Sequence, residues 1–147
     1  MILTITDWAG DRVSLEPKVE LYSVRDFMGK ELPGLAIVLD KVGSTPDEAE
    51  EYAVLTVSFG DFLSLKNGAY IDTNNCYFAD QLLRQGIAED TGFSRHSGFC
   101  QYPLWRFKEE FLKEIGGEHY QEYLRRYDEY MGIGRADRSQ DQGMSMQ

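Results

Sequence analysis

Two apolar segments organise this chain, Leu35-Ala-Ile-Val-Leu39 and Tyr52-Ala-Val-Leu-Thr-Val-Ser-Phe59, and the polar segment Ser44-Thr-Pro-Asp-Glu-Ala-Glu-Glu51 separates them. The first segment is short, continuously apolar and bounded by turn residues, which is typical of a central strand. The second segment alternates between two faces, which is typical of a strand with one buried side. Because the polar segment is too hydrophilic to bury, we predict an antiparallel hairpin with an acidic connection.

The sequence before this hairpin predicts further strands, and the sequence after it changes to helical spacing. Apolar residues alternate with polar ones in three pairs: Leu3 and Ile5, Val13 and Leu15, and Val19 and Leu21. A turn at residues 66–68 precedes one more short strand. Helical spacing follows in three segments, near residues 78–86, 107–115 and 118–131, with Gly116-Gly117 between the last two. Residues 88–103 show no clear period and predict a long loop.

This order of elements predicts an α+β fold, with an N-terminal antiparallel sheet followed by about three helices packed on it. A chain of 147 residues suits one domain, and an apolar fraction of 42% is enough for a core. The residues after 131 have little apolar side chain to pack. We therefore predict a single domain over residues 1–131 and a disordered tail over residues 132–147.

The charge balance argues against binding to bare nucleic acid. The formal net charge is −10, so most of the surface repels a phosphate backbone, and we expect no direct binding to duplex DNA. The same charge favours a basic protein partner, although many acidic proteins are acidic for solubility alone. With two cysteines, no signal peptide and no membrane-spanning segment, we expect a cytoplasmic protein without a membrane partner.

The residues suited to catalysis or metal binding are few. Cys76, His96, Cys100 and His119 match the number of ligands that zinc needs, but their spacing does not match a zinc site, so we expect no metal and no cofactor. The segment Gly92-Phe-Ser-Arg-His96 lacks the second glycine of a nucleophile elbow and does not follow a recognisable strand. Neither phosphate-binding glycine pattern occurs. We expect a protein that is not an enzyme.

Three regions carry the candidate partner-binding residues. The connection of the first hairpin is acidic, and Arg95 and His96 lie in the predicted loop among aromatic residues. The last helix places tyrosines along one face, which packs in the core or presents a recognition surface. The residues that we assign to partner binding are Asp47, Glu48, Glu50, Glu51, Arg95, His96, Glu122, Tyr123 and Tyr127.

A longer pattern connects these regions. It comprises Tyr70-Ile-Asp-Thr-Asn-Asn75, a helix ending at Gly86, the pairs Thr91-Gly92 and Ser97-Gly98, and Tyr102-Pro-Leu-Trp-Arg-Phe107. In this order it resembles an uncharacterised domain family, a domain of unknown function encoded on bacterial mobile elements. The resemblance covers roughly residues 30–130. It implies a mobile-element context and carries no known reaction.

We expect a small acidic accessory protein of a mobile element that acts by protein contact. The partner class that we favour is a basic nucleic-acid-handling enzyme, such as a host defence nuclease of the restriction or CRISPR type, with carboxylates replacing phosphates in its groove. A second hypothesis is a small-molecule or hydrolytic site, in which Arg95 and His96 converge with Ser94 or Asp72. A third is a binder of single-stranded nucleic acid through arginines and aromatic rings. The sequence leaves the oligomeric state open.

Overall fold

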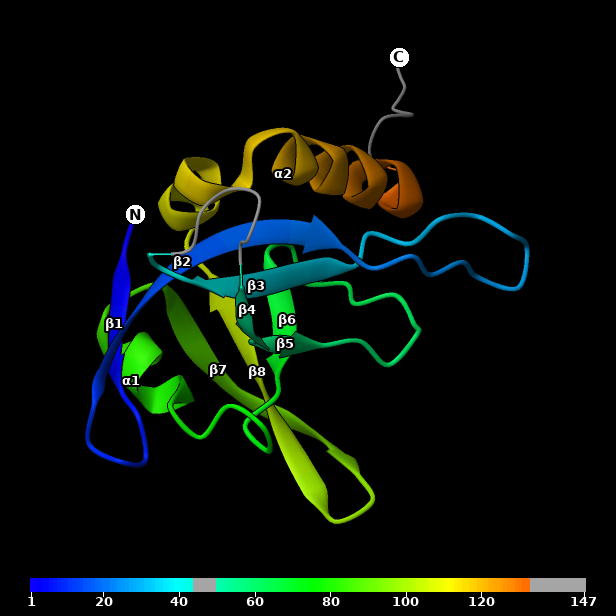
Figure 1. The fold of residues 1–147 in the computed structure, drawn as a ribbon. Coiled ribbons are helices and arrows are strands. Elements are labelled where there is room, and N and C mark those ends of the chain that lie inside the picture. Colours follow the sequence, from blue (N-terminus) through cyan, green and yellow to red (C-terminus); the bar gives the residue numbers. More distant parts are fainter. Residues whose placement is uncertain (44–49, 133–147) are drawn as a thin grey trace.

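A computed structural model describes residues 1–43 and 50–132, whose strands form two antiparallel sheets of four strands each (Figure 1). The order is β1-β2-β3-β4 in the first sheet and β5-β6-β8-β7 in the second. With two helices in this part of the chain, the α+β class is confirmed. The first sheet comprises β1 (Leu3–Thr6), β2 (Arg12–Leu21), β3 (Leu35–Lys41) and β4 (Glu51–Val54). The remaining elements are β5 (Thr56–Val57), β6 (Gly68–Ile71), β7 (Ala88–Ser97), β8 (Cys100–Phe107), α1 (Ala79–Arg84) and α2 (Glu109–Met131).

The first sheet forms where alternation predicts it. In β2, Leu15 and Val19 are buried, whereas Glu16 and Lys18 between them are exposed. β3 is buried on both faces from its first residue to Leu39, as its continuous apolar run indicates. β3 pairs antiparallel with β4, so the predicted hairpin is confirmed, and most of its acidic connection lies outside the described residues.

The strand predicted from Tyr52 to Phe59 is divided at Leu55. β4 before this residue belongs to the first sheet, and β5 after it belongs to the second. Leu55 is fully buried, its N–H donates to Ile37 O at 2.9 Å, and its carbonyl accepts from Asp72 N at 2.9 Å. Alternation indicates which face of a segment is buried, but it does not indicate where the strand changes its hydrogen-bond partner. The sequence pattern therefore does not predict the division at Leu55.

The prediction of a long loop over residues 88–103 is wrong. This region forms β7 and β8, an antiparallel hairpin that extends away from the rest of the molecule (Figure 1). From Glu89 to Ser97 no residue is buried, so neither face supplies the apolar period that identifies a strand. A bulge between Asp90 and Ser94, with Gly92 at φ 85°, interrupts the register further.

The prediction of about three helices is also wrong, because the last two are one element. α2 continues past Gly117, where φ 52° and ψ −138° produce a kink instead of an end. Gly116 is buried before the kink, and a Cβ there would lie 2.3 Å from the Tyr120 Cβ. The glycine pair therefore redirects the helix as it crosses the molecule (Figure 1).

Helix α2 packs along an edge of β2 that has no strand neighbour. β1 pairs only with residues 12–15 of β2, and beyond them His119 Nδ1 lies 2.8 Å from the Val19 carbonyl oxygen. The buried Tyr120 and Tyr123 rings stack with centroids 6.2 Å apart. The Tyr120 hydroxyl donates to Asn67 Oδ1 at 3.0 Å, which ties the helix to the turn before β6.

Helix α1 covers the outer edge of β1 through two glutamine side chains. Gln81 Oε1 accepts from Thr6 N at 2.7 Å, and Gln81 Nε2 donates to Thr6 O at 2.9 Å. Gln85 makes the same two contacts with Thr4, at 3.3 and 2.7 Å. The side-chain amides thus satisfy edge N–H and C=O groups that would otherwise invite another strand.

Candidate binding surfaces

Three carboxylates are paired across the first sheet, and the β3–β4 part of the pairing has a bulge between Leu39 and Asp40. Glu16 of β2 is directly opposite Asp40 of β3, and Asp40 is directly opposite Glu51 of β4. Residues opposite one another in antiparallel strands have Cβ atoms about 4.5–5.5 Å apart, and like charges in such pairs destabilise a sheet. We call Glu16, Asp40 and Glu51 the acidic row. Repulsion between these carboxylates costs folding free energy, so a contribution to the stability of the sheet does not account for the acidic row.

Lys18 lies against the acidic row. Its Nζ is 3.1 Å from Asp40 Oδ2. This hydrogen bond raises the Lys18 pKa, partial burial opposes the change, and the charges of Glu20 and Glu51 add to it. Glu16 and Glu51 are exposed on either side of the Lys18–Asp40 pair. The row therefore keeps a negative charge at both ends.

Of the four acidic residues of the connection that we predicted to bind a partner, the structure describes two. Glu50 and Glu51 are described and exposed, and Glu51 is itself a member of the row. Asp47 and Glu48 lie outside the described residues.

Many cations in the described residues are paired with carboxylates of the same chain. Such exposed pairs contribute about 0–1 kcal/mol each to stability, but they do neutralise the charge of the cation. Since the chain has 25 acidic and 15 basic residues, pairing leaves an excess of carboxylates. The pairs are Lys18–Asp40, Lys30–Glu129, Lys66–Asp128, Arg95–Asp61, Arg106–Glu89, Lys113–Glu109, Arg125–Glu122 and Arg126–Glu31.

Glu122, which we predicted to bind a partner, is neutralised within α2. Its Oε2 lies 2.6 Å from Arg125 Nη2 and 2.8 Å from Arg126 Nε. Hydrogen bonds from Arg125 and then Arg126 lower the pKa of Glu122 to about 2. This carboxylate is therefore part of an ion-pair network on α2 and is not a member of the acidic row.

The two tyrosines assigned to partner binding lie in the core. Tyr123 is 1% exposed and Tyr127 is 6% exposed. The Tyr123 hydroxyl accepts a hydrogen bond from Asn67 N at 2.9 Å, and burial raises the pKa of this phenol. Of the two alternatives for the tyrosine face, core packing is the one that the structure shows, so these side chains are not available to a partner.

Arg95 makes specific contacts on the outer face of the second sheet. Its Nη1 lies 2.9 Å from Asp61 Oδ2, and its guanidinium carbon lies 4.3 Å from the centroid of the Phe59 ring. Phe59 packs edge-on against Tyr70 and against Tyr102, each with centroids 5.4 Å apart. We call Asp61, Phe59, Tyr70 and Tyr102 the Arg95 cradle.

The convergent site of the second hypothesis is not formed. Ser94 Oγ accepts from Gln101 Nε2 at 2.6 Å, His96 is exposed, and Arg95 reaches Asp61 instead of either neighbour. Asp72 accepts hydrogen bonds from the Asn75 backbone and side chain. Ser94, His96 and Asp72 therefore do not form a nucleophile–base arrangement with Arg95.

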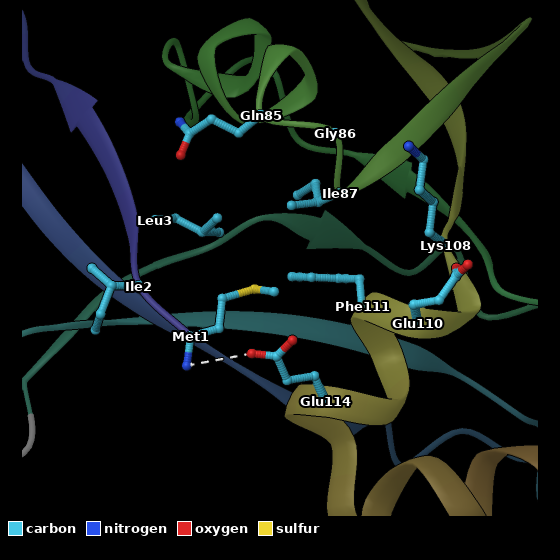
Figure 2. A pocket seen from close by; sticks show the side chains of 10 residues that line it. All are labelled: Met1, Ile2, Leu3, Gln85, Gly86, Ile87, Lys108, Glu110, Phe111 and Glu114. Atoms are coloured by element: carbon cyan, nitrogen blue, oxygen red, sulfur yellow. Dashed lines mark ion pairs between the residues drawn. The ribbon is translucent and has the colours of Figure 1, made fainter.

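A separate groove of about 570 Å³ lies between β1, the end of α1 and the start of α2 (Figure 2). Leu3, Ile87 and Phe111 converge on its floor, and the Met1 amino group lies 3.8 Å from Glu114 Oε2 at its margin. Its volume falls in the range of small-molecule pockets. The residues that line it are Met1, Ile2, Leu3, Gln85, Gly86, Ile87, Lys108, Glu110, Phe111 and Glu114, which include no histidine, cysteine or serine.

The four residues considered for zinc are not brought together. Within residues 1–43 and 50–132, no three His, Cys, Asp or Glu side chains form a group that could hold a metal ion. Cys76 is buried, its Sγ donates to Val54 O at 3.4 Å, and burial raises its pKa to about 12. His119 lies against Val19, whereas His96 and Cys100 belong to the β7–β8 hairpin.

Neither helix in the described part of the chain is long and apolar enough to cross a membrane.

Sequence reasoning missed Glu16, Asp40 and the cradle residues Asp61 and Phe59. Glu16 alternates with buried residues, so its outward direction was predictable. Its position opposite Asp40 depends on strand register, which a single sequence does not report. Asp61 and Phe59 follow β5 without any motif that links them to Arg95.

Comparison with known proteins gives one match. A family model described as a domain of unknown function (DUF4313) matches residues 25–127. No curated protein and no solved structure matches the chain.

Proposed function

This chain belongs to the DUF4313 family of domains of unknown function, and we propose that it is a non-enzymatic binding protein that acts by contact with a basic protein. The proposed partner is a cytoplasmic enzyme that handles nucleic acid. The proposed contact surface is the acidic row, together with Glu50 beside it.

The observation that carries this proposal is the register of the acidic row. Asp40 of β3 is the strand partner of Glu16 on β2 and of Glu51 on β4, the second pair lying at a bulge. Like charges in this position cost stability, so we attribute the row to binding instead of to folding. Closely spaced carboxylates are complementary to a groove lined by lysine and arginine, where they replace the phosphates of a nucleic acid.

The charge distribution supports a protein partner over single-stranded nucleic acid. Two of the three arginines that would contact phosphate in the third hypothesis (Arg84, Arg95 and Arg106) are each 2.9 Å from a carboxylate oxygen, Arg95 from Asp61 and Arg106 from Glu89. A phosphate would have to displace both carboxylates against a net charge of −10.

The finer form of the proposal concerns biological context. We propose an accessory protein of a mobile element that inhibits a host defence nuclease of the restriction or CRISPR type. Support for this form comes from the resemblance of the Tyr70–Phe107 pattern to a mobile-element family and from the suitability of the acidic row for a nucleic-acid groove.

A cleavage assay tests the proposal. The protein is added to a panel of restriction nucleases and RNA-guided nucleases, and DNA cleavage is measured at low and high salt. We expect inhibition of at least one nuclease, weakened by salt and by the variant Glu16→Gln/Glu51→Gln.

The matched control is Asp80→Asn/Glu110→Gln, which removes the same charge from exposed positions on the two helices. It should inhibit as the wild type does. If both variants lose inhibition equally, total charge is responsible and the row is not. If no nuclease in the panel is inhibited, the defence-nuclease form of the proposal is wrong.

A further inference from the structure

The outer face of the second sheet already binds one guanidinium group, that of Arg95. Two different contacts hold it: an ion pair with Asp61, 2.9 Å between Nη1 and Oδ2, and a stacked position 4.3 Å from the Phe59 centroid. A planar guanidinium donates hydrogen bonds along its edge and stacks through its face, so these two contacts use both of its binding modes.

The cradle is built from segments other than the one that carries Arg95. Asp61 and Phe59 follow β5, Tyr70 belongs to β6, and Tyr102 belongs to β8. The Phe59 ring is fixed by edge contacts with both tyrosines, at 5.4 Å each. The Phe59 ring is therefore positioned by packing that does not involve Arg95, whereas the exposed Asp61 carboxylate is in contact with Arg95 itself.

Arg95 is attached in a way that permits exchange. It lies on β7, the edge strand of the second sheet, beyond the bulge between Asp90 and Ser94. The Arg95 side chain is 38% exposed and that of Asp61 is 60% exposed. Exposed ion pairs and exposed cation–π contacts are individually weak, so another guanidinium in solution competes for the same groups.

We propose that the Arg95 cradle is a binding site for an arginine side chain of a protein partner, and that Arg95 occupies it in the isolated chain. This inference rests on the proposed function, because a basic partner supplies the arginine. Lysine is a poorer ligand, since its ammonium group offers neither the planar face for Phe59 nor the paired N–H edge for Asp61.

The test uses N-acetyl-arginine-amide as the probe and NMR signals of the Tyr70 and Tyr102 rings as the readout. It compares the wild type with Arg95→Ala and with Arg95→Ala/Asp61→Asn. Removing the internal competitor should tighten probe binding by about fivefold, because an occupied site lowers apparent affinity by its free fraction. The second substitution should reverse this gain, and N-acetyl-lysine-amide should bind more weakly to each protein.

Equal probe binding by the wild type and Arg95→Ala would overturn the inference, as would equal binding of the lysine probe. The backbone signals of β7 and β8 report whether each variant keeps the hairpin, and Arg95→Gln provides a variant that retains a polar side chain there. The variant Glu16→Gln/Glu51→Gln should bind the probe as the wild type does. Because this variant changes only the acidic row, its affinity for the probe shows whether a negative result concerns the Arg95 cradle or the acidic row.

Discussion

The double substitution Glu16→Gln/Glu51→Gln should stabilise the protein at low salt, although it removes charge that we assign to binding. Each glutamate lies opposite Asp40, and a directly opposed pair of like charges costs roughly 0.2–1 kcal/mol. Lys18, whose Nζ is 3.1 Å from Asp40 Oδ2 and which also interacts with Glu51, offsets part of this cost. We expect a net gain of about 0.5 kcal/mol, which for a domain of this size corresponds to about 2 °C in melting temperature.

The assay is thermal unfolding at about 20 mM and about 1 M sodium chloride, where screening lengths differ severalfold. The control Asp80→Asn/Glu110→Gln lowers the total charge by the same amount, but it also removes favourable acidic side chains from the first turns of α1 and α2, so the comparison with the wild type is decisive. The row variant should melt above both the control and the wild type at low salt, and the differences should shrink at high salt. A row variant that melts at or below the wild type at low salt would refute the argument that charge repulsion within the row costs stability.

Three further substitutions test the fold and its pH dependence. Gln81→Ala removes both hydrogen bonds to the exposed Thr6 and should cost about 1 kcal/mol, with faster hydrogen exchange of the Thr6 amide; unchanged exchange would contradict the edge contact. Gly116→Ala places a Cβ 2.3 Å from that of Tyr120 and should cost about 1–3 kcal/mol in denaturant unfolding, so a neutral effect would refute the close packing. The pKa of Glu122 is lowered from 4.5 to about 2, so its ion pairs stabilise the fold fully above pH 4.5 and lose their effect as pH falls toward 2. The melting difference between wild type and Glu122→Gln should therefore disappear over that pH range, and a difference that persists at pH 2 would contradict the assignment.

The strands of the first sheet were predictable because β2 buries one of its faces and β3 buries both. The alternation in β2 and the continuous apolar run in β3 are direct consequences of which residues face the core. β7 was not predictable in the same way, since nearly all of its residues are exposed and its contacts with β8 are backbone pairing and polar side-chain contacts, which leave no apolar period in the sequence. The Gly116-Gly117 break was located correctly, but a positive φ at Gly117 bends a helix as readily as it ends one.

For the candidate binding residues too, the sequence predicted the residue type and the shared face, but not the contacts that depend on the tertiary fold. Residue type predicted an acidic surface near Glu51, and strand register then extended it to Glu16 and Asp40. The tyrosine spacing in α2 fixed which residues share a face, but the direction of that face depends on packing against Asn67 and β2. Arg95 was identified by type and its partner Asp61 was not, because the two meet only through the tertiary fold.

Displacement of DNA is the most direct test of the central claim that the acidic row occupies a nucleic-acid groove. Labelled DNA is bound to a nuclease that the protein inhibits, and fluorescence anisotropy is followed as the protein is added at increasing salt. The wild type should release the DNA, release should weaken as salt rises, and Glu16→Gln/Glu51→Gln should release less DNA than Asp80→Asn/Glu110→Gln. Simultaneous binding of protein and DNA to the nuclease, or equal release by both variants, would contradict this claim.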